Sequence, residues 1–207
     1  TAGTDGFYDE SNGTDERCCK LVDGNLSTKW CGEMPYEGNA YIEFQSSEPF
    51  VPTSYILTTA GDNTTYPWRN PKNWTIKAKL NKDDDNEEWT TLVTVENDNV
   101  LPSLGDNASH EYTITGNTNS YQYFRFEFSS IHERYEYQVE NYDNVFQLSE
   151  LQFKSNPNGS GNDPIDPQGP QLYSGFTSTA GTDGFYDESN GTDERCSKLV
   201  DGDLNTK

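Results

Sequence analysis

Basic residues are scarce in this chain of 207 residues, which has 14 Lys and Arg against 35 Asp and Glu and a formal net charge of −21. Nucleic acids and anionic lipid head groups bind proteins through Lys and Arg, so neither is an expected partner. No apolar run approaches the roughly 18 residues of a membrane span, so we expect no membrane insertion. A surface this acidic favours divalent cations as partners, or serves to keep a crowded extracellular protein soluble.

Catalytic signatures are also lacking. The chain has only two histidines, His110 and His132, and neither lies in a nucleophile or metal-binding motif. The sequences G-x-S-x-G and H-E-x-x-H do not occur, and paired carboxylates discriminate nothing in so acidic a chain. The sequence therefore predicts a binding or structural protein and not an enzyme.

Aromatic residues, by contrast, are plentiful, with 4 Trp, 13 Tyr and 10 Phe, which argues against a disordered acidic chain. They stand in runs that alternate apolar and polar side chains, as strands do, and no stretch carries a helical apolar stripe. The predicted class is all-β, an antiparallel β-sandwich. The expected strands are residues 41–44, 54–58, 74–80, 89–93, 121–128 and 148–153.

The strongest signal in the sequence is an internal repeat, because residues 1–29 recur as residues 179–207. A run rich in Pro, Gly and Asn separates the copies and is typical of a linker. The expected organisation is a domain over 1–154, a linker over 155–170, and the N-terminal part of the next repeat over 171–207. The copies differ at three positions, where Cys19, Asn25 and Ser27 are replaced by Ser197, Asp203 and Asn205.

Residues 172–178 precede the second copy and are predicted to be the first strand of its sandwich. The first copy starts at Thr1 and has no equivalent strand, so we expect its sheet to have an open edge. Such an edge would pair with another chain or with residues 172–178 folded back.

Residues 20–31 (KLVDGNLSTKWC) resemble the D-G-x-x-x-T-x-W segment of discoidin-like (coagulation-factor C-type) domains and of the related galactose-binding-like carbohydrate-binding modules. Residues 55–63 and 69–74 resemble the family's central strand, loop and next strand. Residues 123–126 and 147–151 resemble its last strands. The resemblance spans residues 1–154 and implies a galactose-binding-like jelly roll, here followed by a truncated second copy.

Many members of this family hold a Ca²⁺ ion with this segment and a Glu near the final strand. Carried over by position, the resemblance implies carboxylate ligands from Asp23 and Glu150, further oxygens from Asn25 and Thr28, and the backbone carbonyl of Lys20. Oxygen donors of this kind suit Ca²⁺, and its role would be structural. The alternative is a plain Asp-Gly turn capped by Thr28.

The loop that holds Asn63, Tyr66, Trp68 and Arg69 is the candidate ligand surface. Sugars bind by stacking a ring face on an aromatic side chain while planar Arg and Asn groups take the hydroxyls. The alternative is that Trp68 caps the rim of the sandwich and Arg69 pairs with a carboxylate. Residues 131–144 form a second candidate surface, rich in Tyr. The other three tryptophans, Trp30, Trp74 and Trp89, are predicted to be core residues.

Among the cysteines, Cys18 keeps a counterpart in Cys196, whereas Cys19 aligns with Ser197. We therefore expect a Cys18–Cys31 disulfide, although four cysteines allow three connectivities.

These patterns favour a Ca²⁺-stabilised glycan-binding or adhesive repeat of a secreted or cell-surface protein, with glycans, glycoproteins or neighbouring copies as partners. The alternative is a structural spacer or filament repeat, whose copies assemble through the open sheet edge and the linker without a small ligand.

Overall fold

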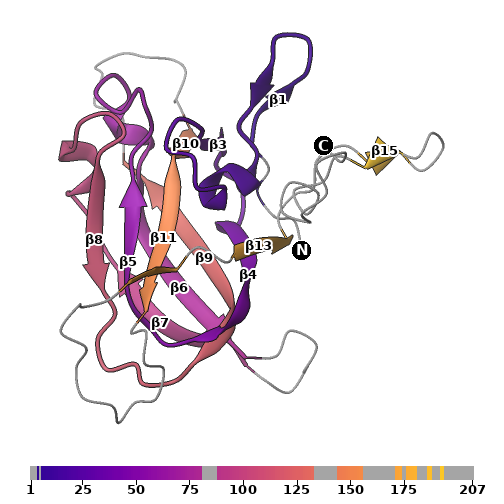
Figure 1. Cartoon of the computed structure of the whole chain (residues 1–207). Coiled ribbons are helices and arrows are strands. Elements are labelled where there is room, and N and C mark those ends of the chain that lie inside the picture. The colour runs from indigo at the N-terminus through magenta and orange to yellow at the C-terminus, as the bar shows by residue number, and fades with distance from the viewer. Residues whose placement is uncertain are drawn as a thin grey trace.

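The computed structural model describes residues 4, 6–80, 88–132 and 144–155, together with the backbone of residues 171–173, 176–180, 186–187 and 192–193 (Figure 1). Residues 133–143 of the second candidate surface and most of the linker lie outside this description. The elements in chain order are β1 (Tyr8–Asp9), β2 (Thr14–Asp15), the 3-10 helix η1 (Cys18–Val22), β3 (Trp30–Glu33), β4 (Ala40–Phe50), β5 (Pro52–Thr58), η2 (Pro67–Arg69), β6 (Pro71–Lys79), β7 (Thr90–Val95), η3 (Leu101–Ser103), β8 (Ser109–Thr113), β9 (Tyr121–Ile131), β10 (Val145–Leu148), β11 (Glu150–Ser155), β12 (Gln171–Tyr173), β13 (Phe176–Ala180), β14 (Tyr186–Asp187) and β15 (Thr192–Asp193).

Two antiparallel sheets form the body of the molecule. One has the strand order β12-β11-β5-β8 and the other β13-β4-β9-β6-β7, while β3 pairs with β10 and β1 with β2 in two small ribbons. The predicted all-β sandwich is confirmed, and each of the six expected strands overlaps an observed one. The strands β3 and β8 were not expected, because neither sequence shows a clear alternation of apolar and polar residues.

The core between the two large sheets is aromatic. Along β9, Phe124, Phe126 and Phe128 point inward and are almost completely buried, as period-two alternation requires. The ring of Phe124 lies 4.9 Å from that of Phe153 on the opposite sheet. The indole Nε1 of Trp74 donates a hydrogen bond of 3.0 Å to the Tyr55 hydroxyl, which satisfies two polar groups inside the core.

The three tryptophans predicted to be core residues do not all behave alike. Trp30 and Trp74 are 0% and 2% exposed and confirm the prediction. The prediction for Trp89 is wrong, because its ring is only half-buried and lies 5.2 Å from the Lys79 ammonium group. Trp89 sits just before β7, at the edge of its sheet, where only one side of the ring can be covered.

The segment that precedes the second copy folds back onto the first domain. Its predicted strand is in fact two strands, β12 and β13, which pair with different sheets. In Figure 1, β13 runs beside β4 and close to η1. The expected open edge is therefore covered by this chain's own residues.

The hairpin of the first copy recurs in the second. In the first copy, Tyr8 pairs with Asp15 and Asp9 with Thr14. In the second copy, the equivalent residues of β14 and β15 pair in the same register. The same local sequence therefore forms the same strand pairing twice.

Candidate functional site

Two carboxylates, the buried Glu150 and the half-buried Asp23, lie at the centre of the expected metal site. Asp23 follows η1, and Glu150 opens β11, so the fold brings together residues that are far apart in the sequence. The side chain of Glu150 is 2% exposed. Its Oε2 atom has no hydrogen-bond partner among the described residues. A buried carboxylate oxygen without a partner is costly, and such an atom needs an explanation.

The electrostatics of this pair favour a cation. Burial, followed by repulsion from Asp23, raises the pKa of Glu150 from 4.5 to about 8, although backbone amides of Gly24, Asn25 and Leu151 oppose the shift. Burial also raises the pKa of Asp23. The ammonium of Lys20 lies 3.9 Å from Asp23 but only 3.2 Å from Asp15, so it is shared between two carboxylates. A bound cation would relieve the remaining repulsion.

The alternative Asp-Gly turn is also present. The Asn25 amide donates to Asp23 Oδ1 at 2.9 Å. The Thr28 hydroxyl donates to Asp23 Oδ2 at 2.9 Å and lies 2.8 Å from the Asn25 carbonyl oxygen. Gly24 has φ of +74°, which suits glycine. The turn explains Asp23, Asn25 and Thr28, but it leaves Glu150 Oε2 without a hydrogen-bond partner among the described residues.

The donor set indicates which cation would fit. Across the described residues, no group of three or more His, Cys, Asp or Glu side chains lies close enough to hold a metal. Any ion held by Asp23 and Glu150 would therefore take its remaining ligands from carbonyl, amide or hydroxyl oxygens. Ca²⁺ accepts such a set, whereas Zn²⁺ prefers nitrogen and sulfur ligands.

Three of the four residues predicted to bind a ligand form one cluster. The rings of Tyr66 and Trp68 meet edge-to-face with centroids 5.7 Å apart. The guanidinium carbon of Arg69 lies 4.0 Å above the Tyr66 ring. All three side chains are half-buried, and the short helix η2 that carries two of them packs against β10 and η3. The loop is thus held on a rigid support.

Asn63, the fourth residue, is not available to a ligand, and its assignment is wrong. Its side chain is 0% exposed. Its amide nitrogen donates to the carbonyl oxygens of Leu101 and Leu104 at 3.2 and 2.9 Å, and its Oδ1 accepts from Asn70 at 2.6 Å. Asn63 instead fastens the loop that carries Tyr66 and Trp68 to η3.

A polar cleft of about 340 Å³ lies between the β1–β2 hairpin, the turn that ends at Thr28, and Gly61 and Asp62. Lys29 bridges its walls, with its ammonium 2.9 Å from Asp62 and 3.6 Å from Glu16. Burial opposes the charged form, but the Asp62 hydrogen bond and nearby negative charges raise the pKa of Lys29 overall.

Lys29 also connects this cleft to β10. Its ammonium donates to Gln147 Oε1 at 3.2 Å. Gln147 is 0% exposed, and its Nε2 has no hydrogen-bond partner in the part of the chain that the structure describes. The sequence did not predict Lys29 or Gln147 as part of this site, because the two residues are far apart in the chain and neither belongs to a recognisable motif.

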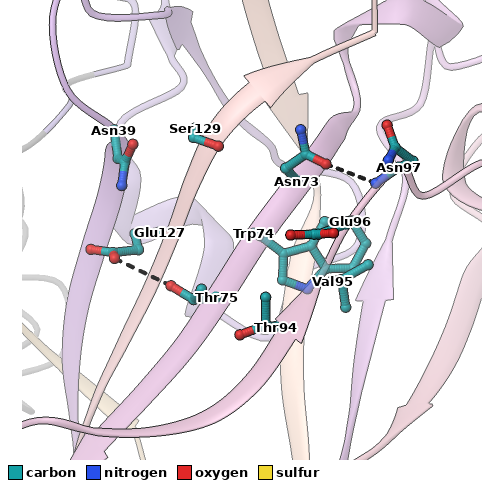
Figure 2. A pocket seen from close by; sticks show the side chains of 10 residues that line it. All are labelled: Asn39, Asn73, Trp74, Thr75, Thr94, Val95, Glu96, Asn97, Glu127 and Ser129. Carbon is teal, nitrogen blue, oxygen red and sulfur yellow. Dashed lines mark hydrogen bonds between the residues drawn. The ribbon is translucent and has the colours of Figure 1, made fainter.

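A second hollow of about 420 Å³ lies on the outer face of the five-stranded sheet. Figure 2 shows its polar lining, with Asn73, Thr75, Glu127 and Ser129 on neighbouring strands. Thr75 donates to Glu127 at 3.2 Å, and Asn73 accepts from the Asn97 amide at 2.7 Å. These two hydrogen bonds pair four of the lining residues, and no buried polar atom without a partner lines the hollow in the part of the chain that the structure describes, so nothing in it calls for a ligand.

The expected Cys18–Cys31 disulfide is wrong, since no disulfide joins these residues in the described part of the chain. Cys18 packs into the aromatic core, whereas Cys31 is buried outside that cluster and lies beside Glu16. Burial and the Glu16 charge raise the pKa of Cys31 to about 12, so its thiol stays protonated and unreactive.

Comparisons with known proteins concern the fold. No protein-family model and no curated protein matches this chain. Two solved structures of the CBM32-1 and CBM32-2 domains of Clostridium perfringens ZmpB are similar to it, one of them in complex with GalNAc. Each is 15% identical over 74% of this chain, with TM-scores of 0.50 and 0.51, and the chain spans 32% and 33% of their lengths.

An F5/8 type C domain of Bacteroides fragilis is also 15% identical, over 74% of this chain and 89% of its own, with a TM-score of 0.47. At this level of identity the ZmpB structures show the fold alone. The fold is that of the galactose-binding-like carbohydrate-binding modules, so the resemblance seen in the sequence is confirmed.

Within the described residues, no helix has the length and apolar character needed to cross a bilayer.

Proposed function

We propose that this chain is a Ca²⁺-stabilised glycan-binding repeat of a secreted or cell-surface adhesive protein. The observation that carries the proposal is the cluster of Tyr66, Trp68 and Arg69, held on a rigid loop of a carbohydrate-binding-module fold. Tandem copies would convert weak binding at single sites into avidity.

The cluster supplies the groups that sugar recognition needs. An aromatic ring offers an apolar face for the C–H side of a pyranose, and a guanidinium offers donors in a fixed plane to its hydroxyls. Lys29 and Asp62 add a charged donor and an acceptor in the adjacent polar cleft. The net charge of −21 disfavours sialylated or sulfated glycans, so a neutral sugar is the expected ligand.

Calcium would act as a structural ion. Asp23 and Glu150 would supply carboxylate oxygens, and Asn25, Thr28 and the carbonyl of Lys20 would complete the set. The bound ion would neutralise the buried Glu150 and the half-buried Asp23, and it would tie the start of β11 to the turn after η1. A site filled by protein oxygens leaves no open position for chemistry, so the module would bind its ligand without transforming it.

The test is a glycan array of neutral and anionic glycans, including terminal GalNAc, probed with the wild-type chain and with Trp68→Ala. The matched control is Thr94→Ala, which changes the hollow on the outer sheet face. We expect binding to neutral glycans that falls at least about tenfold in Trp68→Ala, as loss of one stacking contact of about 1.4 kcal/mol would give. Equal loss in Thr94→Ala, or no loss in Trp68→Ala, would place the site elsewhere.

The structural-repeat function remains the second candidate, and one observation favours it. The strands β12 and β13, which lead into the second copy, complete both sheets of the first domain. No binding to any glycan, with EGTA lowering only the melting temperature, would support this function instead.

A further inference from the structure

The strands β12 and β13 extend the two sheets of the sandwich, each strand at one edge of a different sheet. In β12, Gln171, Leu172 and Tyr173 pair with Ser155, Lys154 and Phe153 of β11. After two intervening residues, β13 pairs with β4 of the other sheet, with Phe176 opposite Ser46, Thr177 opposite Gln45 and Ser178 opposite Phe44. These two strands therefore cover one edge of each sheet, where the backbone groups of β11 and β4 would otherwise be open to another strand, while β8 and β7 form the opposite edges.

The connection to this segment is far longer than its position requires. Ser155 and Gln171 face each other across the ladder, yet residues 156–170 separate them. Directly opposed residues in an antiparallel ladder lie only about 5 Å apart, and a hairpin needs two to five residues to join them. Fifteen residues, by contrast, reach up to about 50 Å when extended. The linker is therefore long enough for the strand pair to reach either its own domain or the domain of another chain.

We propose that residues 171–180 form an exchangeable strand pair that completes the sandwich of a second copy of this chain as well as its own. The backbone hydrogen bonds are the same in both arrangements, so the choice depends on chain entropy and on protein concentration. A tether of this length corresponds to an effective concentration in the millimolar range. Exchange between copies would therefore become substantial when the protein is crowded.

The position of the strand pair within the repeat gives the exchange a direction. Residues 179–207 repeat residues 1–29, so the strand that completes one domain continues directly into the next copy. Reciprocal exchange between two chains would give a closed dimer, and one-way exchange would join copies into a linear array. The proposal stands independently of glycan binding, since neither β12 nor β13 carries a residue of the Tyr66–Trp68–Arg69 cluster.

The test uses full chains with single introduced cysteines. Gln45→Cys and Thr177→Cys lie opposite each other in the β4–β13 ladder. Both are made in a Cys196→Ser background, and the remaining cysteines are buried. The two chains are mixed, unfolded, refolded together over a range of concentrations and oxidised. A third chain that carries both substitutions reports pairing within one molecule, and exposed Asn99→Cys, mixed with Thr177→Cys, is the control.

In an equal mixture, exchange predicts a covalent dimer of the two single-cysteine chains, present in about a quarter of the molecules near millimolar concentration and several-fold rarer after tenfold dilution. The Asn99→Cys control should not reach this yield. A cross-link only within the doubly substituted chain would overturn the proposal, because the strand pair would then stay with its own domain. No cross-link in any chain would overturn it as well, because β13 would then not pair with β4.

Discussion

Replacing Glu150 by Gln removes the carboxylate that opens β11 while keeping its size. In the folded protein this group is 2% exposed, and its pKa is raised from 4.5 to about 8 by burial and by Asp23. In the unfolded chain the pKa returns to about 4.5. Between about pH 4.5 and pH 8, the folded state therefore keeps a proton on Glu150 that the unfolded state has released.

The sign of the effect follows from this difference. Without Ca²⁺, the contribution of Glu150 is fully present below about pH 4.5 and is lost as pH rises through about 8. At about 1.4 kcal/mol per pH unit, the free energy of unfolding falls by about 3 kcal/mol by pH 7 and by about 5 kcal/mol above pH 8. The same loss should be absent in Glu150→Gln, whose amide does not ionise.

Calcium should reverse the loss in the wild-type chain only. An ion present at about a thousand times its dissociation constant adds about 4 kcal/mol to the free energy of unfolding, which offsets most of the cost of ionising Glu150. The Gln variant loses one carboxylate ligand, so its response to calcium should be much smaller.

The assay is urea unfolding between pH 5 and 8.5, with calcium or with EGTA. The control is Glu33→Gln, an exposed carboxylate on β3, which should keep the wild-type behaviour. The reasoning fails if Glu150→Gln gains as much stability from calcium as the wild type does, or if the metal-free wild type is equally stable at pH 5 and pH 8.

Three further predictions concern the rest of the domain. Phe126→Ala empties a fully buried site between Trp74 and Phe128 and should cost about 3–5 kcal/mol by urea unfolding; a loss below 1 kcal/mol would contradict this packing. Gly24→Ala meets no neighbour within 4 Å but forces φ of +74° on alanine, so a loss of about 1–2 kcal/mol is expected, and an unchanged melting temperature would show that the turn relaxes. Dithiothreitol should leave the melting temperature unchanged, because no disulfide joins Cys18 to Cys31; a lower melting temperature in dithiothreitol would show that the disulfide forms after all.

Local sequence pattern predicted much of this protein. Alternation of apolar and polar residues located β9 and the other long strands, because side chains of a strand point to opposite faces whatever the rest of the chain does. The turn at Asp23, which the sequence offered as the alternative to a metal-binding loop, forms because glycine readily adopts positive φ. The repeat predicted that the second copy would begin like the first, and the hairpins β1–β2 and β14–β15 share a register.

The tertiary structure decided whatever depends on burial and on pairing between distant segments. An Asn in a loop can face a ligand or the protein interior, and the sequence does not distinguish the two. Here the side chain of Asn63 is buried against η3, where it donates to the carbonyl oxygens of Leu101 and Leu104 and so is not part of the ligand surface. Cys18 and Cys31 are separated because one faces the core and the other faces Glu16. The stretch predicted as one strand became β12 and β13 because it pairs with two different sheets, first with β11 and then with β4. Sequence periodicity reports which face a side chain prefers, whereas the neighbours on that face are known only once the two sheets have packed together.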